Sequence, residues 1–491
     1  MFRKGSARDF WMHDSTPARW IVAVSAWIAQ SRNSRNYDRH EKDPSDDAAP
    51  WMKSMKNHVW RSCLCVFAFV SVFVSGFTAI AQSPARLTGK IAYIQEGNIW
   101  VQVLTEGIRR QLSQGGQAYH PQWSASGHWL SFTQTEKVNV IPIDLFGRND
   151  TITLETDRSA WSPKLDEIAF VDHGALAVLR LEPVIRQKRI VFRQPDPGNI
   201  ADFEWSPDGT SLAVATTSDG PDRITRLWYV NADGSSSREI SFVRPLYSPH
   251  FEFAGWSSDG ERILLWVGGF SASLAADGLP LVSVSVTSGD LQPVANDIPA
   301  RVTQARGPGS AVLQYKEYIA VSPFGNRVLV ISGFNRNAWT NKRLIAFNTA
   351  TGNIRVLTDA DKAVASCAWS PDGNAIAFAA GPDDREAGGG ERAKRALAQR
   401  RIWIMNADGQ QRRQLTADAK YRDEYPLWSR DGQHIVFMRM DTQNRISVWS
   451  VGVYDGTLLK LVDQIMGPAA TDSWFGYYGH VAWPGFIAFS Q

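Results

Sequence analysis

The sequence predicts an all-β protein, and three observations lead to that prediction. A phrase made of a Trp-Ser pair, a tight turn and an apolar strand recurs along the 491 residues. A second phrase, an alternating strand that ends in an Asp-Gly or Thr-Gly turn, follows several of its copies. The two ends of the chain carry complementary parts of one more unit. One supersecondary unit repeated at this spacing is typical of a radial or stacked repeat fold.

The first phrase has its clearest form in Trp-Ser-Pro-Asp-Gly, where Pro presets φ and Gly accepts a positive φ in the tight turn. Its copies occupy residues 120–132, 159–170, 202–214, 254–266, 319–331, 367–378, 426–437 and 481–489. Val321 stands where the fifth copy should have Trp. Eight units are therefore predicted, with seven as the alternative.

The second phrase occupies residues 227–234, 344–352, 401–409 and 448–456. Apolar alternation with a period of two, bounded by such turns, indicates a β-hairpin. One unit is therefore a sheet of four antiparallel strands. Because such a sheet cannot bury both faces by itself, the units must stack around an axis, which predicts a β-propeller.

The chain ends predict how the ring closes. Residues 89–114 resemble the later strands of a unit, and residues 479–491 resemble its Trp strand. One blade is therefore split between the N- and C-terminal segments. Residues 91–94 and 486–489 both resemble a second strand, and the sequence leaves open which of them is displaced.

An apolar run over residues 63–81 predicts that the protein is exported. It follows several basic residues and ends in the small-x-small triplet Ala79-Ile80-Ala81. Residues 59–82 are thus a signal peptide or, since the run has the length of a membrane span, an N-terminal anchor. The propeller would lie in the periplasm, outside the cell, or on the outer side of the membrane.

Residues 1–58 precede this segment and are expected to be a disordered leader. Met52 and Met55 lie at suitable distances from the apolar run to be the true initiator; a cytoplasmic tail is the alternative. Residues 88–491 then form a single β-propeller domain.

The charge of the chain argues against nucleic acid as a partner. The formal net charge of +3 arises in residues 1–81, which hold 11 Lys and Arg against 7 Asp and Glu. The rest of the chain has 41 positive and 42 negative side chains. A near-neutral body offers no basic footprint. Cys63 and Cys65 lie in the apolar run, so Cys367 has no partner for a disulfide in the body.

Residues 369–373, together with residues 402–416, closely resemble the repeats of TolB-type, WD-repeat-like β-propellers. The resemblance covers about residues 88–491 and implies an exported bacterial module that binds or scaffolds other molecules. The same repeat type is similar to the propeller that gates prolyl oligopeptidase-like enzymes. TolB itself has six blades and a separate N-terminal domain, so its partner does not follow from the resemblance.

Catalytic motifs are missing from the sequence. The nearest match to the nucleophile elbow Gly-x-Ser-x-Gly, at residues 269–273, lacks its last Gly, and no metal-binding or phosphate-binding motif occurs. The triple glycine at residues 388–390 is interpreted as a flexible insertion. We therefore expect a non-enzymatic module, without a cofactor or metal, that binds a protein, peptide or glycan. A hydrolase or lyase assembled from long loops is the alternative.

Alternation of strand direction places the short turns on one face of the ring and all long insertions on the other, here called the long-loop face. The insertions are residues 268–279, 300–312, 381–400 and 466–479. Variable loops on a rigid scaffold commonly bind ligands, so partners are expected on the long-loop face.

Counting three residues back from the Trp of each copy, or from Val321 in the fifth, gives one side chain per blade at the channel mouth. The set is His120, Arg158, Asp202, Phe253, Tyr318, Ser366, Tyr425 and His480. These side chains either satisfy nearby backbone groups and water or contact a small polar ligand or a peptide end. The repeated Trp side chains themselves are predicted to pack between blades.

A second candidate site is the aromatic loop before His480. Trp474, Phe475, Tyr477 and Tyr478 lie within five positions there. They either cap the seam at which the ring closes or form an exposed anchor for a partner. The sequence leaves both interpretations open.

Overall fold

The computed structural model describes residues 87–143, 150–182, 186–219, 225–242, 251–267, 280–294, 319–333, 337–385, 390–465 and 479–490. The chain divides into two units, Met1–Pro84 and Ala85–Gln491, and all described residues lie in the second. The predicted leader, the signal or anchor segment, Tyr318 and the aromatic loop lie outside the described residues. Within the described part of the chain, no helix is both long and apolar enough to cross a membrane.

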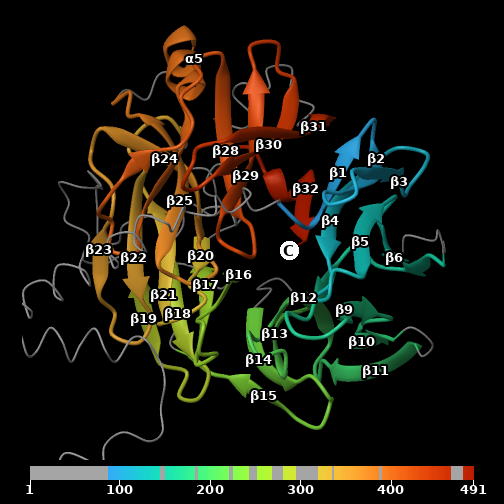
Figure 1. Ribbon diagram of the computed structural model, residues 1–491. Coiled ribbons are helices and arrows are strands. Elements are labelled where there is room, and N and C mark those ends of the chain that lie inside the picture. Colours follow the sequence, from blue (N-terminus) through green and yellow to red (C-terminus); the bar gives the residue numbers. More distant parts are fainter. Residues whose placement is uncertain are drawn as a thin grey trace, which may run out of the picture. The chain divides into compact units, whose positions relative to one another are not determined.

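The second unit is a β-propeller of eight four-stranded antiparallel blades in a ring (Figure 1), which confirms the predicted fold class. The blades are numbered here along the chain. The strands of each blade are given from the innermost outward. Blade 1 contains β32 (Ile487–Ser490), β1 (Lys90–Gln95), β2 (Asn98–Val103) and β3 (Ile108–Gln111), and blade 2 contains β4 (Ala118–Trp123), β5 (Trp129–Gln134), β6 (Lys137–Pro142) and β7 (Ile152–Leu154). Blade 3 contains β8 (Ser159–Trp161), β9 (Glu167–Asp172), β10 (Ala175–Leu181) and β11 (Arg186–Arg193), and blade 4 contains β12 (Gly198–Trp205), β13 (Ser211–Ser218), β14 (Thr225–Asn231) and β15 (Ser237–Ile240).

The other four blades repeat the same order. Blade 5 contains β16 (Phe251–Trp256), β17 (Arg262–Val267), β18 (Leu281–Ser285) and β19 (Leu291–Val294), and blade 6 contains β20 (Ile319–Val321), β21 (Arg327–Ser332), β22 (Arg343–Asn348) and β23 (Ile354–Val356). Blade 7 contains β24 (Lys362–Trp369), β25 (Ala375–Pro382), β26 (Arg401–Asn406) and β27 (Arg413–Gln414), and blade 8 contains β28 (Tyr421–Trp428), β29 (His434–Asp441), β30 (Ile446–Gly452) and β31 (Leu458–Ile465). Blade 6 starts at β20 with Val321 in the Trp position, so the chain has eight blades rather than seven.

The core lies between neighbouring blades. One cluster joins Ala169, Leu176 and Val178 of blade 3 to Trp205 and Val214 of blade 4, and similar clusters fill other seams. Of the repeated Trp side chains, those at 205, 256, 369, 428 and 483 are buried, and those at 123 and 161 are half-buried. Burial of these large indole side chains contributes strongly to the packing between blades.

Four of these indoles also bind their own innermost strand to the innermost strand of the blade before it. Trp205, Trp369 and Trp428 donate Nε1–H to the backbone oxygens of Ala160, Ala320 and Ala368 at 2.9, 3.0 and 3.2 Å. Each acceptor is the residue before the Trp position of the preceding blade. Trp123 makes the same bond to Ala488 at 3.2 Å. This register identifies Phe489 as the residue of blade 1 that occupies the Trp position.

The ring closes through the predicted split blade. β32 pairs antiparallel with β1, so the C-terminal segment is the innermost strand and residues 91–94 remain the second strand (Figure 1). Trp483 lies in a 3-10 helix, η2 (Trp483–Gly485), where Pro484 and Gly485 interrupt the strand. His480, predicted to lie near the start of the innermost strand, instead precedes η2 and is not part of that strand.

A short helix in the blade 7 insertion was not expected from the sequence. α5 (Glu391–Ala398) follows Gly390 directly, where a flexible insertion was predicted. Its buried residues, Ala393, Ala396 and Leu397, pack against Trp339 of blade 6. The insertion is thus anchored on the long-loop face.

Candidate functional site

Five of the innermost strands that the structure describes carry a β-bulge at or beside the predicted channel position. The register shifts next to Asp202, Phe253 and Ser366, and also across Tyr119/Gln122 and Glu424/Leu427. At the last two bulges His120 and Tyr425 adopt φ values of 52° and 55°, which are uncommon for residues other than glycine. Bulges commonly redirect a side chain next to a functional site.

The structure places the predicted channel residues in different surroundings. His120 and Arg158 are exposed, Asp202 and Tyr425 are partly buried, and Phe253, Ser366 and His480 are buried. Ser366 Oγ accepts a hydrogen bond from the Tyr425 backbone N–H at 3.2 Å. This contact fits the structural interpretation for blades 7 and 8, where the side chains satisfy neighbouring backbone groups.

His120, Arg158 and Asp202 instead line one cavity of about 520 Å³ at the inner ends of blades 2, 3 and 4. β8 has three residues, whereas its neighbours β4 and β12 have six and eight. Asp157 and Arg158, which precede this short strand, line the cavity.

The closing segment also forms part of this cavity. Pro484 lines it, and a Cβ added to Gly485 would lie 3.3 Å from Cδ2 of His120. The backbone of η2 therefore lies directly against the imidazole.

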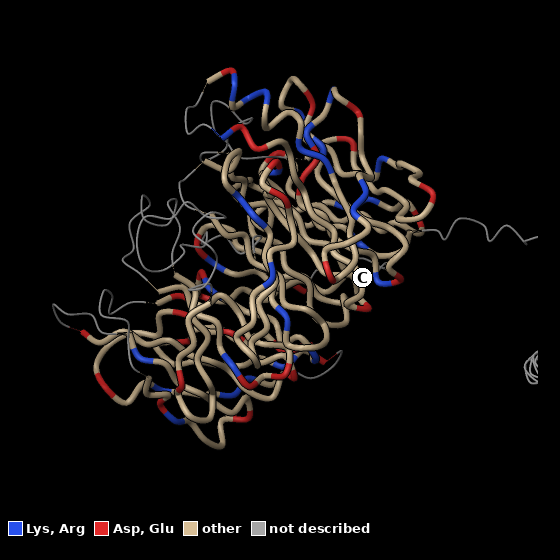
Figure 2. The backbone as a smooth tube through the Cα atoms, turned by 90° about the vertical axis from the view of Figure 1, so that its left-hand side faces the viewer, with Lys and Arg blue, Asp and Glu red and all other residues tan. Residues whose placement is uncertain are grey.

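The cavity carries charges of both signs. Asp157, Asp202 and Glu204 contribute carboxylates, and Arg158 contributes a guanidinium. Among the described residues, the side chains of Asp157 and Arg158 have no hydrogen-bond or ion-pair partner, so both are available to a ligand. In the rest of the propeller, acidic and basic residues are interspersed along the chain (Figure 2).

Two indole rings complete the cavity wall. Trp161 donates its Nε1–H to Ser131 Oγ at 2.8 Å, and Trp123 uses its own for the bond to Ala488. Both indoles therefore offer ring surface, rather than a free donor, to whatever enters.

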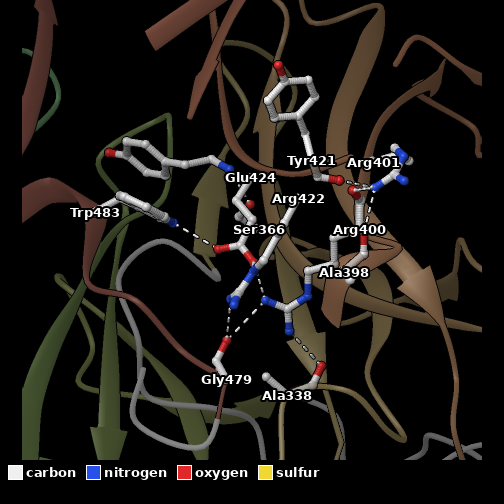
Figure 3. A network of polar contacts seen from close by, with 11 residues as sticks. Ala338, Ser366, Ala398, Arg400, Arg401, Tyr421, Arg422, Glu424, Gly479 and Trp483 are labelled. Carbon is white, nitrogen blue, oxygen red and sulfur yellow. Dashed lines mark hydrogen bonds and ion pairs between the residues drawn. The ribbon is translucent and has the colours of Figure 1, made fainter. Parts of the chain in front are cut away.

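A buried polar network, which no sequence pattern indicated, joins blades 6, 7 and 8 to the closing segment (Figure 3). Glu424 of β28 accepts hydrogen bonds from Arg400 and from Arg422, the latter at 2.5 Å. Its second oxygen accepts the indole N–H of Trp483 at 3.0 Å. Arg400 and Arg422 also donate to the backbone oxygen of Gly479, at 3.0 and 3.2 Å.

The network fixes the closing segment to two insertions. Arg400 follows α5 and donates to Ala338 O of the blade 6 insertion at 3.0 Å, while Gly479 and Trp483 precede β32. Burial by itself would raise the pKa of Glu424, but the charges of Arg422 and Arg400 outweigh that effect and lower the pKa to about 2. Glu424 is therefore ionised throughout the neutral range.

No group of three or more potential metal ligands occurs in the part of the chain that the structure describes. His120 and His480, which the sequence places on adjacent blades, are accordingly not joined by further ligands there.

No family model matches the chain, and no curated protein matches it. Solved β-propellers are similar in fold. A putative TolB from Agrobacterium tumefaciens is 14% identical, covers 82% of this chain and 99% of its own, and has a TM-score of 0.34. Dipeptidyl peptidase 4 of Porphyromonas gingivalis is 11% identical over 78% of this chain and 60% of its own, with a TM-score of 0.49. An oligogalacturonate lyase bound to manganese is 11% identical over 73% and 83%, with a TM-score of 0.42. The likeness is one of fold alone.

Proposed function

We propose that this protein is an exported, non-enzymatic binding or scaffolding module that engages a protein, peptide or glycan on its long-loop face. The observation that carries the proposal is the cavity shared by His120, Arg158 and Asp202. Three consecutive blades each contribute one of these side chains. The volume of about 520 Å³ lies within the usual range of ligand pockets.

The chemistry of the cavity favours a polar partner with charges of both signs. Arg158 can bind a carboxylate, and Asp157, Asp202 and Glu204 can accept hydrogen bonds from an amine. The end of a peptide, or a loop with acidic and basic side chains, meets both requirements. The indole rings of Trp123 and Trp161 would contact its apolar parts.

A rigid frame supports binding at this site. The indole bonds between blades and the network around Glu424 hold the innermost strands and the closing segment in place. Preorganised side chains lose less freedom when a partner binds. Export is supported by the apolar run at residues 63–81, which follows basic residues and ends in a small-x-small triplet.

Site-specific photo-crosslinking in cells that express the full chain tests the proposal. A photoreactive amino acid replaces Gln122, which is exposed and lines the cavity. The control replaces Phe324, which is 63% exposed in a short turn on the opposite face. We expect an adduct from position 122, none from position 324, and loss of the adduct when Arg158→Ala and Asp202→Ala are combined.

Equal adducts from both positions, or an adduct that the double substitution leaves intact, would contradict binding in the cavity. Chemical conversion of the captured molecule by the wild-type protein, but not by the double variant, would replace the binding function by an enzymatic one.

A further inference from the structure

A second cavity, of about 490 Å³, lies between blades 7 and 8 on the face opposite to the long loops. It is bordered by the turns that follow β24 and β28, and by those that follow β26 and β30. Ile404, Met405 and Trp428 are buried apolar side chains of its wall. The cavity therefore combines an apolar floor with a rim of turn residues.

Four polar side chains at the rim are uncommitted. Asn406, Gln411, Arg430 and Tyr454 are exposed and make no side-chain hydrogen bond or ion pair with any residue that the structure describes. Together they offer a guanidinium, two amides and a phenol hydroxyl. Amides and hydroxyls both donate and accept hydrogen bonds.

The ionised groups in the wall cancel in charge. Asp372 and Asp431 face Arg413 and Arg430 in the same lining. Asp431 Oδ1 already accepts bonds from Ser429 Oγ at 2.5 Å and from the Gln433 N–H at 3.0 Å, whereas its Oδ2 has no partner among the described residues. A ligand without net charge that can both donate and accept hydrogen bonds fits this lining best.

Tyr454 adds an aromatic surface that the fold does not require. The turn after β26 is Asn-Ala-Asp-Gly and is closed by a bond from Gly409 N–H to Asn406 O. In blade 8 the bond runs from Gly456 N–H to Gly452 O, so the turn is one residue longer and includes Tyr454. Tyr454 is 84% exposed, so its ring contributes little to packing.

We infer that this cavity between blades 7 and 8 binds a neutral saccharide. The hydroxyls of a sugar ring would hydrogen-bond to Arg430, the amides and Asp431 Oδ2, and the C–H face of the ring would pack on Tyr454. With the long-loop face occupied by another partner, the propeller would connect two ligands on opposite faces. The saccharide site does not depend on the proposed channel-mouth site.

Saturation-transfer difference NMR of the full chain tests this inference with lactose, maltotriose, cellotriose, chitotriose and the charged sialyllactose as probes. We expect saturation transfer to at least one neutral probe. Tyr454→Ala and Arg430→Ala should each weaken binding of that probe by about tenfold or more, since both replace direct contacts. Phe324→Ala is the matched control, because it removes another exposed aromatic from the same face and should leave binding unchanged.

Several results would overturn the inference. They are the absence of transfer to every neutral probe, stronger binding of sialyllactose than of lactose, and equal losses in the Phe324→Ala and Tyr454→Ala variants. The combined Arg158→Ala and Asp202→Ala variant should bind the sugar normally. Loss of sugar binding in that variant would move the site to the channel mouth and refute its location between blades 7 and 8.

Discussion

Replacing Glu424 by Gln should lower the stability of the closed ring more than the same replacement of an exposed Glu does. The change leaves Arg400 and Arg422 buried without the carboxylate to which both donate. The pKa of about 2, against an ordinary 4.5, corresponds to about 3 kcal/mol of stability at neutral pH. Loss of one partner from a buried ion pair costs ~3–5 kcal/mol in other proteins. We therefore expect the free energy of unfolding in urea to fall by about 3 kcal/mol or more.

The same group sets a direction for the pH dependence. Because the folded-state pKa is depressed, the contribution of Glu424 is complete above about pH 4.5 and is lost as the pH falls towards 2. The variant should lack this part of the acid destabilisation. Hydrogen exchange should also show faster exchange in residues 487–490, since Trp483 and Gly479 lose their anchor.

Glu155→Gln is the matched control. Glu155 pairs with Lys137 at the surface, where its side chain is 73% exposed, so its loss should cost less than about 1 kcal/mol. If Glu424→Gln unfolded at the same urea concentration as the wild type, or if Glu155→Gln cost as much, the assignment of the network as the anchor of the closing segment would be refuted.

Three further predictions concern the ring. Removal of residues 479–491 should expose the edge of β1 and cause aggregation, measured by light scattering; a soluble monomer with unchanged melting would contradict closure by β32. Trp369→Phe should cost about 1 kcal/mol or more in urea unfolding, because Ala320 O loses its donor, and no change would argue against the bond between blades. Burial raises the pKa of Cys367 to about 12, so iodoacetamide should label this thiol only after unfolding; peptide mapping that finds Cys367 itself labelled in the native protein at pH 8 would contradict its burial.

The sequence was sufficient to predict the architecture because each repeat marks its own register. Trp in a fixed place, a turn with Gly, and an alternating strand after it specify four strands with little ambiguity, and the structure confirms all eight blades. In the C-terminal copy, counting back from Trp483 gave the wrong channel residue, because Trp483 belongs to η2 and Phe489 occupies the Trp position of β32. A strand cannot run through Pro484 without losing a backbone donor.

The features around the channel were harder to predict for a physical reason. The residues counted at His120, Arg158 and Asp202 border one cavity, but three separate blades and Pro484 of the closing segment form its wall, and no single motif encodes that arrangement. Arg400 and Glu424 are 24 positions apart, and Gly479 lies further along the chain, so nothing in their local patterns indicates that they meet.

An experimental structure of the protein joined to the partner captured through position 122 would test the central claim most directly. The claim predicts partner density inside the cavity between blades 2 and 4, with a polar contact to Arg158 or Asp202. A partner seated on the outer strands or on the short-turn face, with the cavity empty of it, would contradict the claim.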